Sequence, residues 1–459
     1  MKNHPANSLR FIPAALGLAV CLLSNNAMAQ SQYFGVGGTL SWDDPNWSVS
    51  GGTSAGPFAS NWTPGDFARF YGAGSYAVTV NNSESMSGMV EDSTTAGAAL
   101  TINAAGSGNL SVVPSATATA GLFVQGFFAA SGQTLTINAP ISGSGGVSFG
   151  LFNSATPTVN LYGNNTYSGG TVMNSSSVLM GFNNNSSFGT GPIVDNGTTF
   201  APLLATGGSL ITLANNFSMF ASGGINFASA ANTPVRSTGT WSLGANNLNL
   251  RNNGNSTAPL TLTGVISGTG NMSFSGANGG TISLSGANTY SGTTTVGMTG
   301  DTAIRLTLAA ANTIASSSQL IMFGGTVDPA GQHHTMTGTT LALTGNSAFD
   351  FTSGAAEMDF AKSAGVAWTA GKTLNLVSTG GGNWNLSSDY LEVGTDGTGL
   401  TTAQLAEIEF NGADLGAAGI TSTGYIYDTA QVVPEPSTVL LGLLGGLGVM
   451  SNIRRRRTA

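Results

Sequence analysis

Two stretches of the chain repeat each other, and this repeat constrains the fold more than any other feature. Residues 135–149 read LTINAPISGSGGVSF, and residues 260–274 read LTLTGVISGTGNMSF. A second shared block follows each of them, LYGNNTYSGGT at 161–171 and LSGANTYSGTT at 284–294. The LTI and LTL triplets alternate apolar and polar residues, the period of a half-buried strand. The SGSG, SGTG and NTYSG strings predict turns, in which Gly and Asn can accept a left-handed backbone.

A strand–turn unit of this kind predicts an all-β chain that coils on itself. The composition agrees, because 67 of the 459 residues are Gly and only 7% are charged, which suits short strands and tight turns. We predict a right-handed parallel β-helix, a solenoid in which each coil buries its apolar positions against its neighbours. We assign it to residues 71–345, with repeats at 135–171 and 260–296. An antiparallel sandwich or a propeller would show similar strand and turn patterns in the sequence, so both remain as alternatives.

The sequence changes character from about residue 346 onward. Ten of the twenty acidic residues lie between Asp350 and Asp428, and the strand–turn rhythm loosens. Residues 400–408 give the one helix predicted in this body. The residues expected to cap this helix or to share its buried face are Thr401, Thr402, Leu405 and Ile408. Because solenoids need atypical ends, residues 346–432 are predicted to form a β-rich C-terminal capping subdomain.

Residues 30–70 are predicted to cap the other end of the solenoid. Their aromatic residues include Trp42, Trp47, Trp62, Phe67 and Phe70. Buried, these side chains would close the first coil as a hydrophobic cap. Exposed, the tryptophans would form a platform on which sugars stack. The solvent exposure of the tryptophans separates the two hypotheses.

Residues 1–29 have the parts of a secretory signal peptide. These parts are a positive start with Lys2 and Arg10, an apolar run over 11–23, and an A-x-A site at Ala27 and Ala29. Signal peptidase is therefore expected to cut before Gln30.

Residues 433–459 also fall into three parts. A short polar motif comes first, formed by Val433, Pro434, Glu435, Pro436 and Ser437. An apolar run follows, and residues 437–453 as a helix would span about 25 Å, close to a bilayer core of about 30 Å. An arginine cluster closes the chain, formed by Arg454, Arg455, Arg456 and Arg457. This order predicts a single transmembrane helix with the arginines on the cytoplasmic side; a plain anchor behind a proline-rich linker is the alternative.

The order of Pro-Glu-Pro motif, short span and arginine cluster resembles the PEP-CTERM sorting signal of Gram-negative bacteria. The resemblance covers residues 433–459 and implies processing by an exosortase, a membrane transpeptidase-like enzyme. It also implies export through a transient inner-membrane anchor to the cell surface or the extracellular matrix. Extracellular polysaccharide is therefore a candidate partner.

The block at 284–294, and more loosely the block at 161–171, resembles the autotransporter-associated β-strand repeat. The pattern of that repeat is Leu-x-Gly-x-Asn-Thr-Tyr-Ser-Gly-x-Thr. The resemblance implies a passenger-type β-helix displayed at a bacterial surface. The sequence departs from that family at its C-terminal end, which carries the sorting tail instead.

The basic residues are few and scattered. Six of the twelve lie near the two ends, and the others are Arg69, Arg236, Arg251, Arg305, Lys362 and Lys372. With a net charge of −8, the chain lacks the basic surface that nucleic-acid binding requires.

Two local matches to catalytic motifs fail on their context. Residues 52–56 read GTSAG, the G-x-S-x-G string of serine hydrolases, but their flanks do not predict the strand and helix of a nucleophile elbow. Residues 371–373 read GKT, yet Val366 stands where a phosphate loop needs its first Gly.

The candidate metal ligands are also weak. His333 and His334 would point to opposite faces of a strand and could not share a metal; a surface turn is their predicted setting. Asp389, Glu392 and Asp396 could bind calcium weakly, but their spacing matches neither an EF-hand nor a nonapeptide repeat. Solvated loop acids are the preferred interpretation, and no metal or cofactor is predicted.

Carboxylate pairs make the best case for an enzyme, because β-helices that cut acidic polysaccharides place acids along a groove. The pairs available are Asp43 with Asp44, Glu91 with Asp92, and Glu357 with Asp359. None is expected to have a basic or histidine companion nearby. We therefore predict a non-enzymatic surface or extracellular-matrix protein, structural or adhesin-like. The alternative is a polysaccharide-active enzyme, a lyase or glycoside hydrolase, which two carboxylates in a deep groove with aromatic walls would favour.

Overall fold

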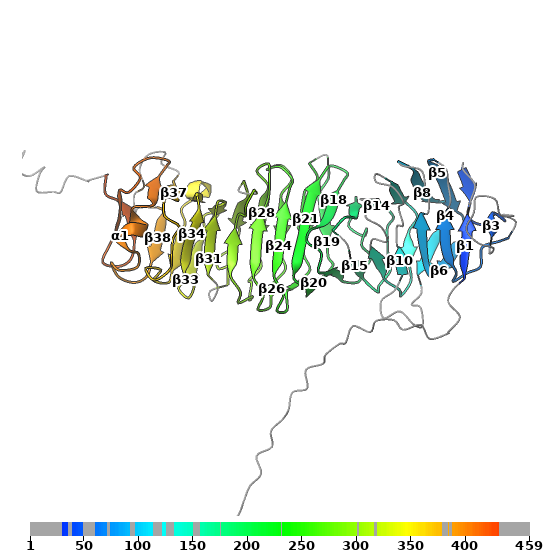
Figure 1. The fold of residues 1–459 in the computed structure, drawn as a ribbon, viewed down its shortest axis with the longest axis horizontal. Coiled ribbons are helices and arrows are strands. Elements are labelled where there is room, and N and C mark those ends of the chain that lie inside the picture. Colours follow the sequence, from blue (N-terminus) through cyan, green and yellow to red (C-terminus); the bar gives the residue numbers. More distant parts are fainter. Residues whose placement is uncertain are drawn as a thin grey trace, which may run out of the picture.

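A computed structural model shows an all-β solenoid whose coils stack along one long axis (Figure 1). It describes residues 30–430 except 35–38, 49–59, 71–73, 92–96, 113–121, 125–132, 150–156, 175, 231, 301–302, 316–318, 379–383 and 385–387. The expected signal peptide and sorting tail lie outside the described residues. Within the described ranges, no helix is long and apolar enough to cross a membrane.

The first face of the solenoid is a 13-stranded parallel sheet. Its strands, in order along the axis, are β2 (Thr39–Ser41), β5 (Tyr76–Val80), β8 (Ala99–Ala104), β11 (Thr134–Ile137), β14 (Thr158–Leu161), β16 (Leu179–Phe182), β18 (Ala201–Ala205), β21 (Gly223–Ser229), β24 (Leu248–Asn252), β27 (Met272–Ser275), β29 (Thr294–Val296), β31 (Leu320–Phe323) and β34 (Leu341–Gly345).

The second face consists of two sheets in succession. A three-stranded sheet comes first, with β6 (Ser83–Met86), β9 (Asn109–Val112) and β12 (Ile141–Ser142). A nine-stranded sheet follows, with β19 (Ile211–Leu213), β22 (Val235–Ser237), β25 (Leu260–Leu262), β28 (Thr281–Leu284), β30 (Arg305–Leu308), β32 (Thr326–Asp328), β35 (Ser347–Asp350), β37 (Leu374–Val377) and β39 (Ile408–Phe410).

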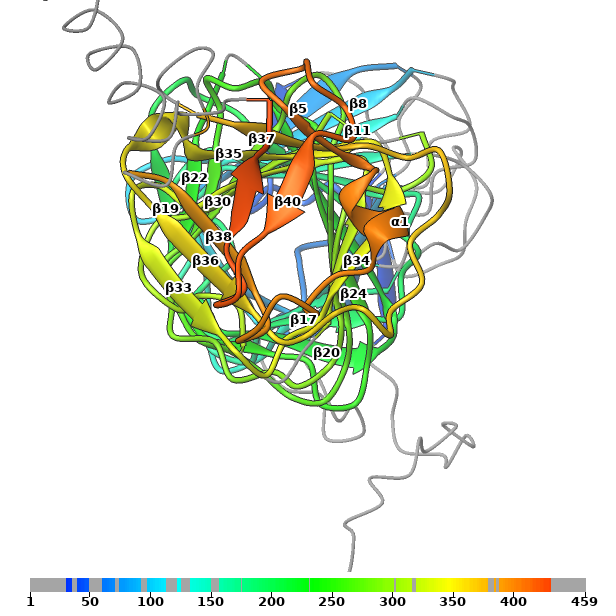
Figure 2. The same cartoon turned by 90° about the vertical axis from the view of Figure 1, so that its left-hand side faces the viewer.

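The third face also consists of two sheets. An 11-stranded sheet contains β3 (Trp47–Ser48), β1 (Ser31–Phe34), β4 (Phe67–Phe70), β7 (Gly88–Glu91), β10 (Leu122–Val124), β13 (Val147–Phe149), β15 (Thr171–Met173), β17 (Ile193–Asn196), β20 (Phe217–Ala221), β23 (Trp241–Ser242) and β26 (Ile266–Ser267). A three-stranded sheet then contains β33 (His333–Met336), β36 (Glu357–Phe360) and β38 (Tyr390–Val393). Figure 2 shows the strands arranged around the axis.

Apolar side chains stack in columns inside the solenoid, one residue from each coil. On the first face the parallel register places five buried residues in one such column: Leu135, Val159, Met180, Leu203 and Phe227. Strands such as β11 and β14 alternate buried and half-buried residues, as the period of two requires. Burying each of these side chains is worth about 1.5–3 kcal/mol. The parallel register confirms the predicted β-helix and rules out the antiparallel sandwich and the propeller.

The two sequence repeats form the same structural unit but begin on different faces. The first repeat starts in β11, on the first face, and runs through β12 and β13. The second starts in β25, on the second face, and runs through β26 and β27. The repeat therefore encodes strand–corner–strand geometry rather than a fixed face.

The NTYSG block has a different physical role from the one its sequence suggested. Asn165 and Asn288 do not have positive φ angles; their side chains bridge coils instead. Asn288 Oδ1 accepts a hydrogen bond from the Ile266 N–H at 2.8 Å, and its Nδ2 donates to the Thr313 carbonyl at 2.6 Å. The Gly of the block is required by space, since a Cβ on Gly292 would lie 2.2 Å from a carbonyl oxygen of the previous coil. The turn expected in this block, in which Asn could accept a left-handed backbone, is therefore not formed.

The N-terminal end is closed by aromatic side chains. Trp42 and Trp47 are fully buried and Trp62 is 8% exposed. The ring centroids of Trp47 and Trp62 lie 4.6 Å apart, and Phe34 and Phe70 pack on the same group. The hypothesis of an exposed sugar-stacking platform is therefore wrong for these three tryptophans, and they form a hydrophobic cap.

The parallel ladders run past residue 345, so the solenoid itself extends into the region predicted as a cap. β35, β37 and β39 continue the second face, and β36 and β38 continue the third. Beyond them lies an antiparallel hairpin of β40 (Ala418–Ile420) and β41 (Ile426–Asp428), across the end of the solenoid (Figure 2). Trp384 is buried beneath it and donates a hydrogen bond to the Ile426 carbonyl at 3.0 Å.

The predicted helix over 400–408 is present but shorter. It is α1 (Thr402–Leu405), and with the 3₁₀ helix η1 (Phe351–Ser353) it makes up the helical content of the described residues. Thr401 is the N-cap and forms a capping box with Gln404, the arrangement that satisfies two unpaired backbone donors. Ile408 lies in β39 rather than on the helix face, because pairing with β37 takes over there.

Candidate functional site

Several residues singled out in the sequence analysis do not come together in a common site. Residues 52–56 and Asp92 lie outside the described residues, as do the sorting motif and the arginine cluster. Gln30 is exposed, and its N–H donates to Asp66 Oδ1 at 3.0 Å. Gly371 lies in a turn with φ +76°, and its N–H donates to Glu407 Oε1 at 3.1 Å.

Asp43 pairs with Glu84, not with its neighbour Asp44. Burial raises the pKa of Asp43, but hydrogen bonds from Glu84, Asn82 and Asn81 outweigh it and hold that pKa below its usual value. Burial and the adjacent Asp43 raise the pKa of Glu84 to about 7. The two carboxyl groups therefore share a proton at mildly acidic pH.

The two histidines lie in strand β33, so the prediction of a surface turn is wrong. His333 is exposed and His334 is fully buried, because adjacent residues of a strand point to opposite faces. His334 Nε2 lies 3.2 Å from the Pro329 carbonyl, and its Nδ1 accepts a hydrogen bond from the Asn312 N–H at 3.2 Å. Burial lowers the pKa of His334, which makes it a neutral core residue.

His333 lies beside two carboxylates of the next coil. β33 and β36 pair in parallel, with His333 opposite Glu357 and Asp359 two residues farther along. His333 Nε2 is 2.8 Å from Asp359 Oδ2 and 3.5 Å from Glu357 Oε2. These three side chains, which we call the His333 cluster, place one ligand atom each within 4.8 Å of the others.

Strand β38 and the residues before β41 surround the His333 cluster. Glu392 lies opposite Asp359 in the parallel register. The Tyr425 hydroxyl donates to Glu357 Oε1 at 3.1 Å, and the rings of Tyr425 and Tyr390 meet at 5.6 Å. Two tyrosines therefore border a group of three carboxylates and one histidine.

The electrostatics of the His333 cluster reflect this excess of carboxylates. The hydrogen bond with Asp359 raises the pKa of His333, and the charges of Asp359, Glu357 and Glu392 act in the same direction. Burial and the neighbouring Asp359 raise the pKa of Glu392. Burial and the contact with Glu357 raise the pKa of Tyr425. The cluster can hold a proton or a cation, and its donor set of one imidazole and two carboxylates suits a divalent metal.

The expectation that no carboxylate pair has a histidine nearby is wrong for Glu357 and Asp359. His333 is 26 residues away from Asp359 in the chain, so local sequence inspection misses the contact. The coil length supplies the missing signal, because residues one coil apart become neighbours in the ladder. The alternative of a weak calcium site fares differently: among the described residues, Asp389, Glu392 and Asp396 do not form a metal-ligand group.

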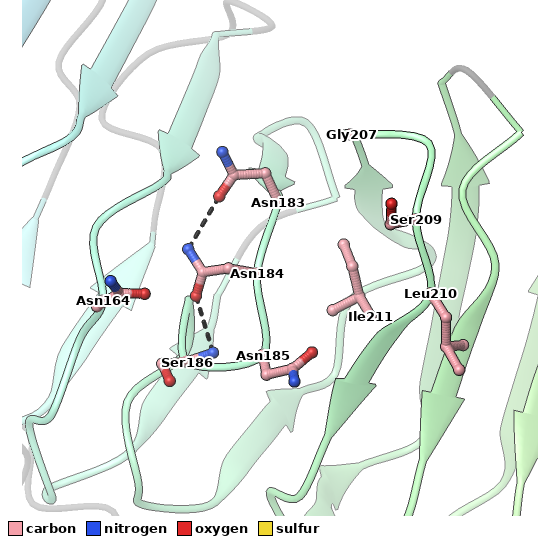
Figure 3. Close-up of a pocket in the computed structure, with 9 residues that line it drawn as sticks. All are labelled: Asn164, Asn183, Asn184, Asn185, Ser186, Gly207, Ser209, Leu210 and Ile211. Carbon is pink, nitrogen blue, oxygen red and sulfur yellow. Dashed lines mark hydrogen bonds between the residues drawn. The ribbon is translucent and has the colours of Figure 1, made fainter.

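A polar depression of about 360 Å³ lies elsewhere on the solenoid (Figure 3). Its lining consists of Asn164, Asn183, Asn184, Asn185, Ser186, Gly207, Ser209, Leu210 and Ile211. Asn184 is held in place, since its Nδ2 donates to the Tyr162 carbonyl at 3.0 Å and its Oδ1 accepts from the Ser186 N–H at 2.8 Å. These lining residues include no acid, base or aromatic ring, so this depression offers hydrogen bonds but no catalytic group.

Short polar side chains link successive coils at one corner of the solenoid. The Asn247 N–H donates to Ser222 Oγ, the Asn271 N–H to Asn247 Oδ1, and the Thr293 N–H to Asn271 Oδ1, at 2.9, 2.9 and 2.8 Å. We call these four residues, Ser222, Asn247, Asn271 and Thr293, the asparagine ladder. The side chains of Ser222, Asn247 and Asn271 each satisfy a backbone donor of the next coil.

Comparison of the chain with protein-family models, with curated proteins and with solved structures finds no match.

Proposed function

We propose that the chain is an exported, non-enzymatic surface or extracellular-matrix protein whose solenoid serves as a structural or adhesin-like rod. The asparagine ladder is the observation that carries this proposal. Outward-facing amide and hydroxyl groups there bind the next coil, so this surface is committed to holding the rod together. A chain selected for an extended, self-supporting shape has this property.

The architecture of the two ends supports the same proposal. Aromatic packing closes the N-terminal coil, and a hairpin over Trp384 closes the C-terminal coil. Closed ends block the stacking of one solenoid on another. The coiling is proposed to be right-handed, because connections between parallel strands take that hand.

The route to the surface rests on the sequence motifs alone. We propose cleavage by signal peptidase before Gln30, then a transient inner-membrane anchor in a Gram-negative bacterium. An exosortase-type enzyme would cut near Pro434 to Pro436, and extracellular polysaccharide is the proposed partner outside. Mass spectrometry of exported protein should find a chain that begins near Gln30 and ends near this motif. Exported protein that retains Arg454 to Arg457 would overturn the processing step.

The rod function is tested separately from its export. The purified protein should bind glycans on an array, or remain attached to isolated extracellular matrix, without changing the length of the polysaccharide. Cleavage of a matrix polysaccharide by the purified protein would instead establish the alternative, a lyase or glycoside hydrolase. The His333 cluster is the observation that favours this alternative, since it supplies a carboxylate pair beside a histidine. The enzymatic activity would then be lost in Glu357→Gln and retained in Glu409→Gln.

A further inference from the structure

The His333 cluster has more negative charge than its own histidine can balance. Glu357, Asp359 and Glu392 face outward from adjacent strands, and His333 is their one cationic partner among the contacts described. Like charges directly opposite each other on neighbouring strands destabilise a sheet. At another place in the described solenoid, the acids Asp328 and Asp350 are balanced, because Arg305 contacts both of them.

Asp359 adds a second and independent indication of a missing partner. The residue is 8% exposed, and its Oδ1 is buried with no hydrogen-bond partner among the described residues. Its Oδ2 is the atom that contacts His333. A buried carboxylate oxygen without a donor is rare in folded proteins, and a cation bound at this carboxylate would satisfy it.

One of the two ligand-atom separations from His333 already fits a tetrahedral ion. Bonds of about 2.1 Å to a tetrahedral zinc ion put neighbouring ligand atoms about 3.4 Å apart. His333 Nε2 and Glu357 Oε2 already lie 3.5 Å apart. The 2.8 Å separation from Asp359 Oδ2 has to widen, and the exposed side chain of His333 has room to do this.

We propose that His333, Glu357 and Asp359 bind one divalent transition-metal ion of the zinc class, with a solvent molecule as the fourth ligand. The imidazole nitrogen favours this class over calcium and magnesium, which prefer sets made of oxygen alone. Glu392 adds negative charge beside the ion. Tyr425 holds Glu357 through its hydrogen bond, the kind of outer contact that orients a metal ligand.

The ion would join two successive coils near the C-terminal end of the rod. His333 comes from β33 and both carboxylates come from β36. Tyr425 precedes β41 and connects the same site to the terminal hairpin. Metal binding would therefore stabilise this end, because binding to the folded state alone adds to its stability.

The test is a calorimetric titration of ZnCl₂ into the full chain after treatment with a chelator. One ion per chain is expected, with affinity at least tenfold lower in His333→Gln and in Asp359→Asn. Glu409→Gln is the matched control, since Glu409 faces outward on β39, away from the cluster, and its affinity should equal that of the unaltered chain. Tyr425→Phe, which removes an outer contact, should weaken binding by about tenfold.

Replacement of zinc with Co²⁺ gives an independent readout. A four-coordinate site with one imidazole should give visible cobalt absorption bands, and His333→Gln should abolish them. Circular dichroism of each metal-free variant checks that its strands are intact. Absence of stoichiometric binding by the full chain, equal zinc affinity in His333→Gln, or tighter binding of Ca²⁺ than of Zn²⁺ would each overturn the proposal.

Discussion

The asparagine ladder and the His333 cluster solve the same problem in opposite ways. Both lie on the outside of the solenoid and both link successive coils. The ladder does this with neutral amides and hydroxyls that satisfy backbone donors. The cluster brings three carboxylates to one place with one histidine. Neutral side chains can link coils without charge, so the concentration of charge across β33, β36 and β38 indicates a local role beyond holding the rod together.

The largest effect is expected where a neutral bridge is buried. Asn288→Ala would leave the Ile266 N–H and the Thr313 carbonyl without their partner. Each unsatisfied buried group costs about 1–3 kcal/mol, so we expect the free energy of unfolding to fall by about 2–4 kcal/mol. Urea denaturation measures the loss, and hydrogen exchange at Ile266 should accelerate.

Two further variants serve as comparisons for the stability loss expected in Asn288→Ala. Asn165→Ala, at the equivalent position of the first repeat, should behave like Asn288→Ala, because Asn165 Oδ1 accepts from the Ile141 N–H at 2.8 Å. Asn164→Ala changes an exposed neighbour and should be close to neutral. Equal stability of Asn164→Ala and Asn165→Ala would refute the bridging role.

A pH-dependent effect is expected at the other carboxyl pair, Asp43 with Glu84. The folded pKa of Glu84 is raised from 4.5 to about 7, so the folded state binds the proton more tightly than the unfolded state. The stabilising contribution is complete below about pH 4.5 and is lost as the pH rises through 7. Because the carboxyl is only half-buried and solvent screens it, we expect a loss of about 1–2 kcal/mol.

The variant Glu84→Gln isolates this contribution. It should match the unaltered chain in thermal stability near pH 4 and exceed it at pH 8, since the amide keeps a hydrogen bond to Asp43 without the charge. A stability difference that does not change between pH 4 and pH 8 would contradict the shared proton.

A smaller loss is expected in the asparagine ladder itself. Asn271→Ala removes the acceptor of the Thr293 N–H, while the N–H of residue 271 keeps its own partner, Asn247. Because water can reach this corner, we expect a cost of about 1 kcal/mol. Thermal unfolding of Asn271→Ala beside Asn271→Asp tests the point, since the carboxylate retains an acceptor. If Asn271→Ala destabilised the fold as much as Asn288→Ala does, burial would not explain a difference between the exposed ladder and the buried Asn288 bridge.

The sequence predicts the solenoid because alternation along a strand and turns between strands are local properties. The column through Leu135, Val159 and Met180 follows from them once the coils are stacked. The His333 cluster was missed because its contacts depend on the register between β33 and β36. No local sequence motif encodes that register. The same reason explains Asn288, whose partners lie 22 and 25 residues away. The sequence marked this block correctly as a break between strands, but the turn expected there is replaced by contacts between coils.

The smallest effect should have the opposite sign from those in the neutral bridges. Burial and the neighbouring Asp359 raise the pKa of Glu392, so ionised Glu392 destabilises the metal-free fold at pH 8. Glu392→Gln should therefore raise the free energy of unfolding by less than about 1 kcal/mol, since this site is solvent-screened. Thermal melts in the presence of a chelator measure the gain, with Glu409→Gln as the neutral control. Because the carboxyl is protonated at low pH, the gain should vanish toward pH 4. If Glu392→Gln instead lost stability at pH 8, the His333 cluster would resemble the asparagine ladder. It would then be one more bridge that stabilises the rod without any cation.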